Sequence, residues 1–137
     1  MKISARNQFA GKVTAVKEGA VNGIVTIDVN GTPVTATISM ASIKELGLEA
    51  GRDAVAVVKA TEVMIGEGSL TLSARNQFAG KVVSVEKGAV NDIVKLDTVI
   101  GTVTATISDG AVQELGLEAG KDAVAVIKAT SVMIGIE

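Results

Sequence analysis

Two copies of one polar segment contain the side chains of this chain that are best suited to bind a ligand. The first copy, Ser4–Val13, begins Ser-Ala-Arg-Asn-Gln and so brings together a hydroxyl, a guanidinium and two carboxamides. The same ten residues recur letter for letter at Ser73–Val82, 69 positions further on. This set donates many hydrogen bonds but contains no nucleophile–base pair and no set of metal ligands. Its chemistry therefore favours an acceptor-rich ligand such as a tetrahedral oxyanion.

A lysine followed by Ala-Thr also occurs once in each half, at Lys59 and Lys128. Ammonium, guanidinium and hydroxyl groups that converge from several directions suit an oxyanion, and small neighbours such as Ala5 and Ala60 let backbone amides approach it closely. The alternative is that these cations are solvated charges at strand ends, which is the common case. Their repetition does not decide between the two, because a duplication preserves structural residues as well as binding residues.

Catalysis is the less favoured class of function. Two carboxylate pairs, Glu45 with Glu49 and Asp28 with Asp53, have nothing in the sequence that brings them into a pocket, and a Ser4–Lys59 dyad is only conceivable. The chain has no phosphate-binding loop, no dinucleotide fingerprint, and neither cysteine nor histidine. The sequence thus predicts a protein that is not an enzyme, with no cofactor and no metal bound directly by side chains.

Composition limits the kinds of partner that the chain is expected to bind. The net charge is −2, and aromatic residues make up 1% of the 137 residues, which argues against binding of nucleic acid. The first residues lack an apolar secretion signal, and no apolar run is long enough to span a membrane. We therefore expect a cytoplasmic chain without membrane or nucleic-acid partners.

The order of elements is expected to be the same in both halves. Turn residues and alternating apolar residues predict a mainly all-β chain of two small OB-like β-barrels, each with one short helix. A turn at Gly19, which we expect to need a positive φ, precedes the next strand, and the Asn30-Gly31 pair predicts a hairpin. Ser39 and Gly47 are expected to cap the helix. In the first half the expected strands are 3–8 leading into 10–17, 24–29, 34–39, 54–59 and 61–65, the helix is 40–46, and the domains are 1–66 and 72–137 with a linker at 67–71.

Three motifs together resemble a known family. Ser-Ala-Arg-Asn-Gln-Phe-x-Gly is followed by Leu-Gly-Leu-x-x-Gly and then by Val-(Val/Ile)-Lys-Ala-Thr-x-Val-Met-Ile, twice and over nearly the whole chain. This combination resembles the Mop domain of the molbindins, small cytoplasmic bacterial proteins that bind molybdate and tungstate. The double occurrence is similar to the tandem-Mop members of that family.

The resemblance implies an OB-like barrel per repeat and a homotrimer of two-domain chains that holds molybdate or tungstate between subunits. It places the helix contact at Ser42, which becomes Ala111 in the second copy and so loses its hydroxyl. It also implies sites on the threefold axis, for which the two Gly-Ala-Val-Asn turns are the candidates. The implied main-site residues are Ser4, Ala5, Arg6, Asn7, Ser42, Lys59 and Ala60, with Ser73, Ala74, Arg75, Asn76, Lys128 and Ala129; the turn residues are Gly19, Ala20, Val21, Asn22, Gly88, Ala89, Val90 and Asn91.

The implied function is non-catalytic storage and homeostasis of molybdenum as its oxyanion. Two alternatives stay open, both of which act through a protein partner: an effector module of molybdate-responsive regulation, and delivery to molybdenum-cofactor synthesis. Since the chain begins directly at the first repeat, DNA binding would have to come from that partner. A third alternative is a paired barrel that serves only to form oligomers.

Overall fold

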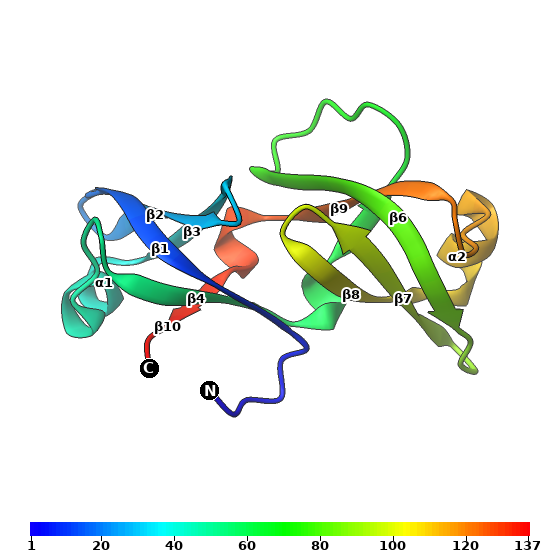
Figure 1. The fold of residues 1–137 in the computed structure, drawn as a ribbon, viewed down its shortest axis with the longest axis horizontal. Coiled ribbons are helices and arrows are strands. Elements are labelled where there is room, and N and C mark those ends of the chain that lie inside the picture. The colour runs from blue at the N-terminus through cyan, green and yellow to red at the C-terminus, as the bar shows by residue number, and fades with distance from the viewer.

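The computed structural model describes residues 1–137 and confirms a mainly β chain of two tandem OB-like barrels, each with one short helix (Figure 1). Both repeats contain the same elements in the same order. The first repeat comprises β1 (Asn7–Lys17), β2 (Asn22–Val29), β3 (Thr32–Ser39), α1 (Met40–Leu46), β4 (Asp53–Val58), the 3-10 turn η1 (Ala60–Glu62) and β5 (Met64–Gly66). The second comprises β6 (Asn76–Glu86), β7 (Asn91–Thr98), β8 (Gly101–Ser108), α2 (Asp109–Leu115), β9 (Asp122–Ile127), η2 (Ala129–Ser131) and β10 (Met133–Gly135).

The last strand of each repeat belongs to the other repeat's sheet. The strand orders are β10-β4-β1-β2-β3 and β5-β9-β6-β7-β8, with all neighbours antiparallel. Met64 of β5 pairs with Val126 of β9, and Met133 of β10 pairs with Val57 of β4. The division into 1–66, 67–71 and 72–137 follows the repeats along the sequence, whereas each barrel in space takes its fifth strand from the other repeat.

The core is built from small and branched side chains. Alternate residues of β2 point inward, so Val25, Ile27 and Val29 are buried while their neighbours are partly exposed. One continuous hydrophobic cluster of 26 buried residues runs through both barrels and includes Phe9 and Phe78. Because this cluster is shared, the two barrels are packed against each other rather than tethered by a loose linker.

Local turn chemistry gives several expected features. Asn30 and Gly31 have φ of 52° and 84°, the left-handed pair that a two-residue hairpin requires. The Ser39 side chain accepts a hydrogen bond of 3.1 Å from the Ser42 amide, and Gly47 ends α1 with φ 63°. The predicted helix over 40–46 and both of its caps are therefore confirmed.

Three expectations about local structure are wrong. Residues 3–6 are not a strand: β1 begins at Asn7, which pairs with Val58, and β4 ends there, so no ladder partner exists beyond it. Residues 60–62 form the turn η1, and only 64–66 form β5. Gly19 is not among the glycines of positive φ; glycine is needed because an added Cβ would lie 2.2 Å from the carbonyl oxygen of Asn22.

Two buried asparagines join the barrels. Asn7 lies in β1, and its Nδ2 donates to the carbonyl oxygens of Val58 (3.2 Å) and Thr104 (2.8 Å), while its Oδ1 accepts from the Thr104 amide (2.7 Å). Asn76 repeats the arrangement on Thr35, with 2.8 Å for both bonds to the backbone. Each carboxamide thus binds the edge strand of the opposite barrel as a neighbouring peptide group would.

The two helices, α1 and α2, have seven residues each. No helix of the chain has the length and apolar character needed to cross a bilayer.

We expect Asn7→Ala and Asn76→Ala each to lower the free energy of unfolding by about 1–3 kcal/mol, because each leaves a half-buried backbone N–H and C=O, of Thr104 or Thr35, without a partner. Chemical denaturation at fixed protein concentration measures this loss. Gln8→Ala is the matched control: its side chain makes one 3.2 Å bond to the Ala5 carbonyl and is otherwise exposed, so the loss is expected to stay below about 1 kcal/mol. Equal losses in all three variants would contradict the assigned role of the asparagines.

Candidate functional site

The repeated motif and the lysine of the second repeat lie side by side. Asn76 at the start of β6 pairs with Ile127 at the end of β9, and Arg75 and Lys128 are the next residues beyond this last pair. Motif and lysine line one open depression of about 440 Å³. Its lining residues are Met64, Leu72, Ser73, Ala74, Arg75, Lys128, Ala129 and Thr130.

The first repeat has the same register. Asn7 pairs with Val58, and Arg6 and Lys59 are the next residues beyond this last pair; both are exposed. Ser4 is exposed, whereas Ala5 is 8% exposed and packs into the barrel wall.

None of the four cations Arg6, Lys59, Arg75 and Lys128 takes part in an ion pair or a side-chain hydrogen bond. Cations that lie close together repel each other, and an anion between them would offset this repulsion. Because all four are exposed, the arrangement is compatible both with an anion site and with solvated charges at strand ends.

The side chains of the motif asparagines are buried and bonded to backbone groups of the opposite barrel. Both hydrogens of Asn7 Nδ2 are donated to backbone carbonyls, and Asn7 is 1% exposed. Asn76 is 2% exposed and bonds Thr35 in the same way. Their side chains therefore position the arginines that precede them.

Ser42 lies apart from Arg6 within one chain. It sits in the first turn of α1, where its hydroxyl is 2.9 Å from that of Ser39. A Cβ added at Gly23 would contact Met40, Ile43 and the carbonyl oxygen of Lys17, so the residues beside Ser42 lie at the end of β1 that contains Lys17. Arg6 precedes the other end of that strand, and a strand of eleven residues is roughly 35 Å long. One ion cannot touch both groups of one chain; in the second repeat, Ala111 occupies the equivalent helix position.

The two Gly-Ala-Val-Asn turns are exposed at the outer ends of the barrels, next to α1 and α2 (Figure 1). Val21 is 74% exposed and Val90 is 72% exposed, which is unusual for valine. The Val21 carbonyl accepts from the Met40 amide at 2.8 Å, and the Val90 carbonyl from Asp109 at 2.9 Å, so each turn is tied to the start of its helix.

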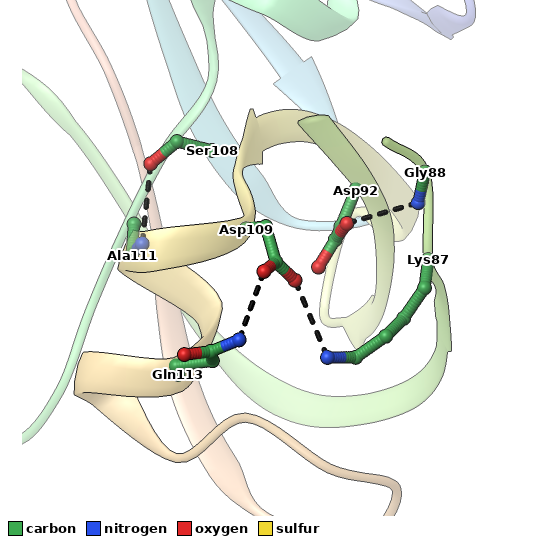
Figure 2. Close-up of polar contacts among 7 residues, drawn as sticks. All are labelled: Lys87, Gly88, Asp92, Ser108, Asp109, Ala111 and Gln113. Carbon is green, nitrogen blue, oxygen red and sulfur yellow. Dashed lines mark hydrogen bonds and ion pairs between the residues drawn. The ribbon is translucent and has the colours of Figure 1, made fainter. Parts of the chain in front are cut away.

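An acidic cluster beside the second turn was not predicted from the sequence. Figure 2 shows Asp92 and Asp109 side by side, with Lys87 reaching Asp109. Lys87 Nζ lies 3.3 Å from Asp109 Oδ1, and Gln113 Nε2 donates to Asp109 Oδ2 at 2.8 Å. Asp92 has no exposed surface, and its Oδ2 has no hydrogen-bond donor. The signal that could have indicated it is Asp92 itself, an acidic residue at a position of β7 where the alternating pattern places buried side chains.

Two neighbouring groups favour the ionised form of Asp109. A hydrogen bond with Asp92 is the largest influence that holds the pKa of Asp109 below its ordinary value of 3.8, and the hydrogen bond from Lys87 is the next.

The predicted carboxylate pair of Asp28 and Asp53 does line one open depression, of about 680 Å³, together with Glu137. Asp53 is ion-paired with Lys12 at 2.6 Å, and no serine, threonine, cysteine or histidine lines the space.

The model of the TOBE domain matches the chain twice, at residues 3–65 and 72–134. The chain therefore belongs to the TOBE-domain family, as a tandem pair, which confirms the resemblance to Mop domains.

Individual relatives share the whole pair or one repeat. A solved structure of the cytoplasmic molybdate-binding protein ModG, with molybdate bound, is 45% identical, covers all of both chains and superposes with a TM-score of 0.96. The molybdenum transport protein ModE of Herbaspirillum seropedicae is 39% identical over 141 residues, which is 100% of this chain but 52% of that protein. A probable molybdenum-pterin-binding protein of Haemophilus influenzae is 55% identical over 67 residues, which is 48% of this chain and 97% of that protein. The chain thus spans about half the length of the longer curated relatives that it matches.

The acidic cluster predicts a pH-dependent effect of Asp109→Asn. Because the folded-state pKa of Asp109 is lowered, its ionised form stabilises the fold fully above about pH 5, and this contribution is lost as the pH falls below 3.8 through the lowered pKa. The thermal midpoint of the variant should therefore lie below that of the wild type at pH 6, and the gap should close toward pH 3. A gap that stays constant across this range would contradict the assignment.

Proposed function

We propose that the chain binds molybdate or tungstate as intact oxyanions in the cytoplasm, for storage and homeostasis of molybdenum, without catalysis. The observation that supports the proposal is that Arg75 and Lys128, which have no acidic partner, line one depression together with Ser73. Molybdate is a dianion near neutral pH and needs hydrogen-bond donors and cations rather than an acid–base catalyst. The chain offers no thiolate or imidazole to bond the metal itself.

Full-length similarity to ModG supports the choice of ligand and compartment. ModG is a cytoplasmic molybdate-binding protein, and its fold follows this chain from end to end at 45% identity. We propose that selectivity over sulfate comes from the size of the closed cavity, because two tetrahedral dianions present the same charge to an arginine fork.

We propose that the main sites lie between copies of the chain, in a homotrimer. The separation of Ser42 from Arg6 within one chain supports this, since a site that uses both must take them from different copies. The proposed first site contains Ser4, Ala5, Arg6 and Asn7 with Lys59, Ala60 and Ser42, and the second contains Ser73, Ala74, Arg75 and Asn76 with Lys128 and Ala129. Here Asn7 and Asn76 act by holding the arginines in place.

We also propose the Gly-Ala-Val-Asn turns as secondary oxyanion sites near the symmetry axis. Their exposure and the small size of the glycine and alanine residues support close approach of backbone amides to an ion.

The alternative is an effector or delivery module that acts through a protein partner. The match of the whole chain to half of a longer molybdenum transport protein supports it. The discriminating test is affinity capture with and without molybdate. A partner retained only with molybdate favours the module, and release of bound molybdate with no partner present favours storage.

We expect Arg75→Ala to weaken molybdate binding at the second-repeat sites by about 10- to 100-fold, because one charged donor is lost; Arg6→Ala should act likewise in the first repeat. Isothermal titration with molybdate, in excess sulfate, measures the affinities, and native mass spectrometry checks that the oligomer persists. Lys81→Ala is the matched control, since this lysine is already paired with Asp122 on the surface at 2.6 Å. Unchanged binding in both arginine variants would sink the proposed sites.

A mixing experiment tests whether each site is shared. In a background of Arg75→Ala, neither Arg6→Ala nor Ser42→Asp should bind molybdate tightly at the first-repeat sites. When the two variants are co-expressed, about a quarter of these sites should recover, because random assembly pairs an intact Arg6 with an intact Ser42 at that share of interfaces. If mixed oligomers with the mass of the wild-type oligomer recover no tight molybdate binding at these sites, one copy supplies both Arg6 and Ser42.

A further inference from the structure

The two Gly-Ala-Val-Asn turns are followed by different residues. The first turn is followed by Gly23 and the second by Asp92, at equivalent inward positions of β2 and β7. The helix residue that faces this position also differs, being Met40 in the first repeat and Asp109 in the second. The two turns therefore have identical sequences but different surroundings.

Asp92 occupies an amide of the second turn. Its Oδ1 accepts a hydrogen bond of 3.0 Å from the Gly88 N–H (Figure 2), while its own side chain has no exposed surface. A carboxylate is itself an oxyanion, so the second turn already holds the kind of group that its amides can bind. In the first turn the Gly19 N–H has no hydrogen-bond partner within the chain.

Charge reinforces the difference. The second turn is surrounded by the carboxyl groups of Glu86, Asp92 and Asp109 against the single ammonium of Lys87. The corresponding residues of the first repeat are Lys17, Glu18, Gly23 and Met40, with one cation and one acid. The second turn therefore opposes a dianion more strongly than the first does.

In the first repeat no side chain occupies the turn in the way that Asp92 does in the second. A Cβ at Gly23 would lie 2.5 Å from Ile43 Cδ1 and 2.9 Å from Met40 Sδ, so apolar side chains occupy the space that the Asp92 carboxyl group takes in the second repeat.

We propose that Asp92 is a built-in anion that closes the second turn to oxyanions, so that only the Gly19–Asn22 turn binds one. This inference rests on the proposed function and deepens it: the main sites occur in both repeats, whereas the turn sites occur in the first repeat alone. Asp92 is thus the residue that determines which turn takes a ligand.

The test is the double variant Asp92→Gly/Asp109→Met, which gives the second turn the residues of the first at these two positions. Equilibrium dialysis against molybdate counts the bound ions per chain, and circular dichroism checks the fold. We expect this variant to bind additional molybdate at the second turn, with one ion per oligomer if three turns share the site. Asp97→Asn, which removes an exposed carboxylate from the same strand β7, is the control and should leave the count unchanged.

The reverse variant, Gly23→Asp/Met40→Asp, covers the case in which the first variant does not fold. It places the acid pair in the first repeat, and we expect the turn site there to be lost while the arginine-dependent sites persist. A folded Asp92→Gly/Asp109→Met protein with no added site, or a reverse variant that keeps every site, overturns the inference. Absence of all molybdate binding in the wild type would instead reject the proposed function itself.

Discussion

The reciprocal contact between the two barrels is the constraint on which the other features depend. Each barrel is completed by a strand from the other repeat, and each edge strand, β3 or β8, is bonded by a buried asparagine from the opposite barrel. A sheet edge with unpaired peptide groups invites association with other chains, and the carboxamides of Asn7 and Asn76 satisfy part of it internally. Arg6 and Arg75 directly precede these asparagines, so the same contacts fix the backbone next to the arginines, where Lys59 and Lys128 follow the paired residues Val58 and Ile127.

Duplication within one chain allows the two halves to diverge where they meet and where they end. At the junction, Glu62 of η1 accepts a 3.1 Å hydrogen bond from Ser131 of η2, its counterpart in the second repeat. Two identical repeats would place two glutamates there, and like charges so close repel. At the outer ends, Asp92 stands where the first repeat has Gly23, beside a turn of unchanged sequence. Under the proposal above, the chain would combine main sites in both repeats with turns of unequal function.

Local chemistry made much of the fold predictable. The Asn30-Gly31 hairpin and the Ser39 and Gly47 caps follow from backbone preferences of those residues alone, and the motif residues did come together. The strand exchange could not be read from the sequence, because Met-Ile-Gly is identical at 64–66 and 133–135 and a strand's pattern does not say which copy it pairs with. Asp92 was missed for a related reason: its role depends on Asp109, a residue seventeen positions away that only the fold brings beside it.

The unpaired cations explain why binding and assembly would be linked in the proposed sites. Arg75 and Lys128 are exposed in the single chain, so water and salt screen their repulsion and the apo chain tolerates it. When another copy covers the depression, that screening is lost and two facing cations become costly unless an anion accompanies them. The oxyanion then stabilises the closed interface by mass action, to a degree set by its concentration relative to Kd. A protein built in this way needs no catalytic group to respond to molybdate, because the anion itself supplies the charge that its interface lacks.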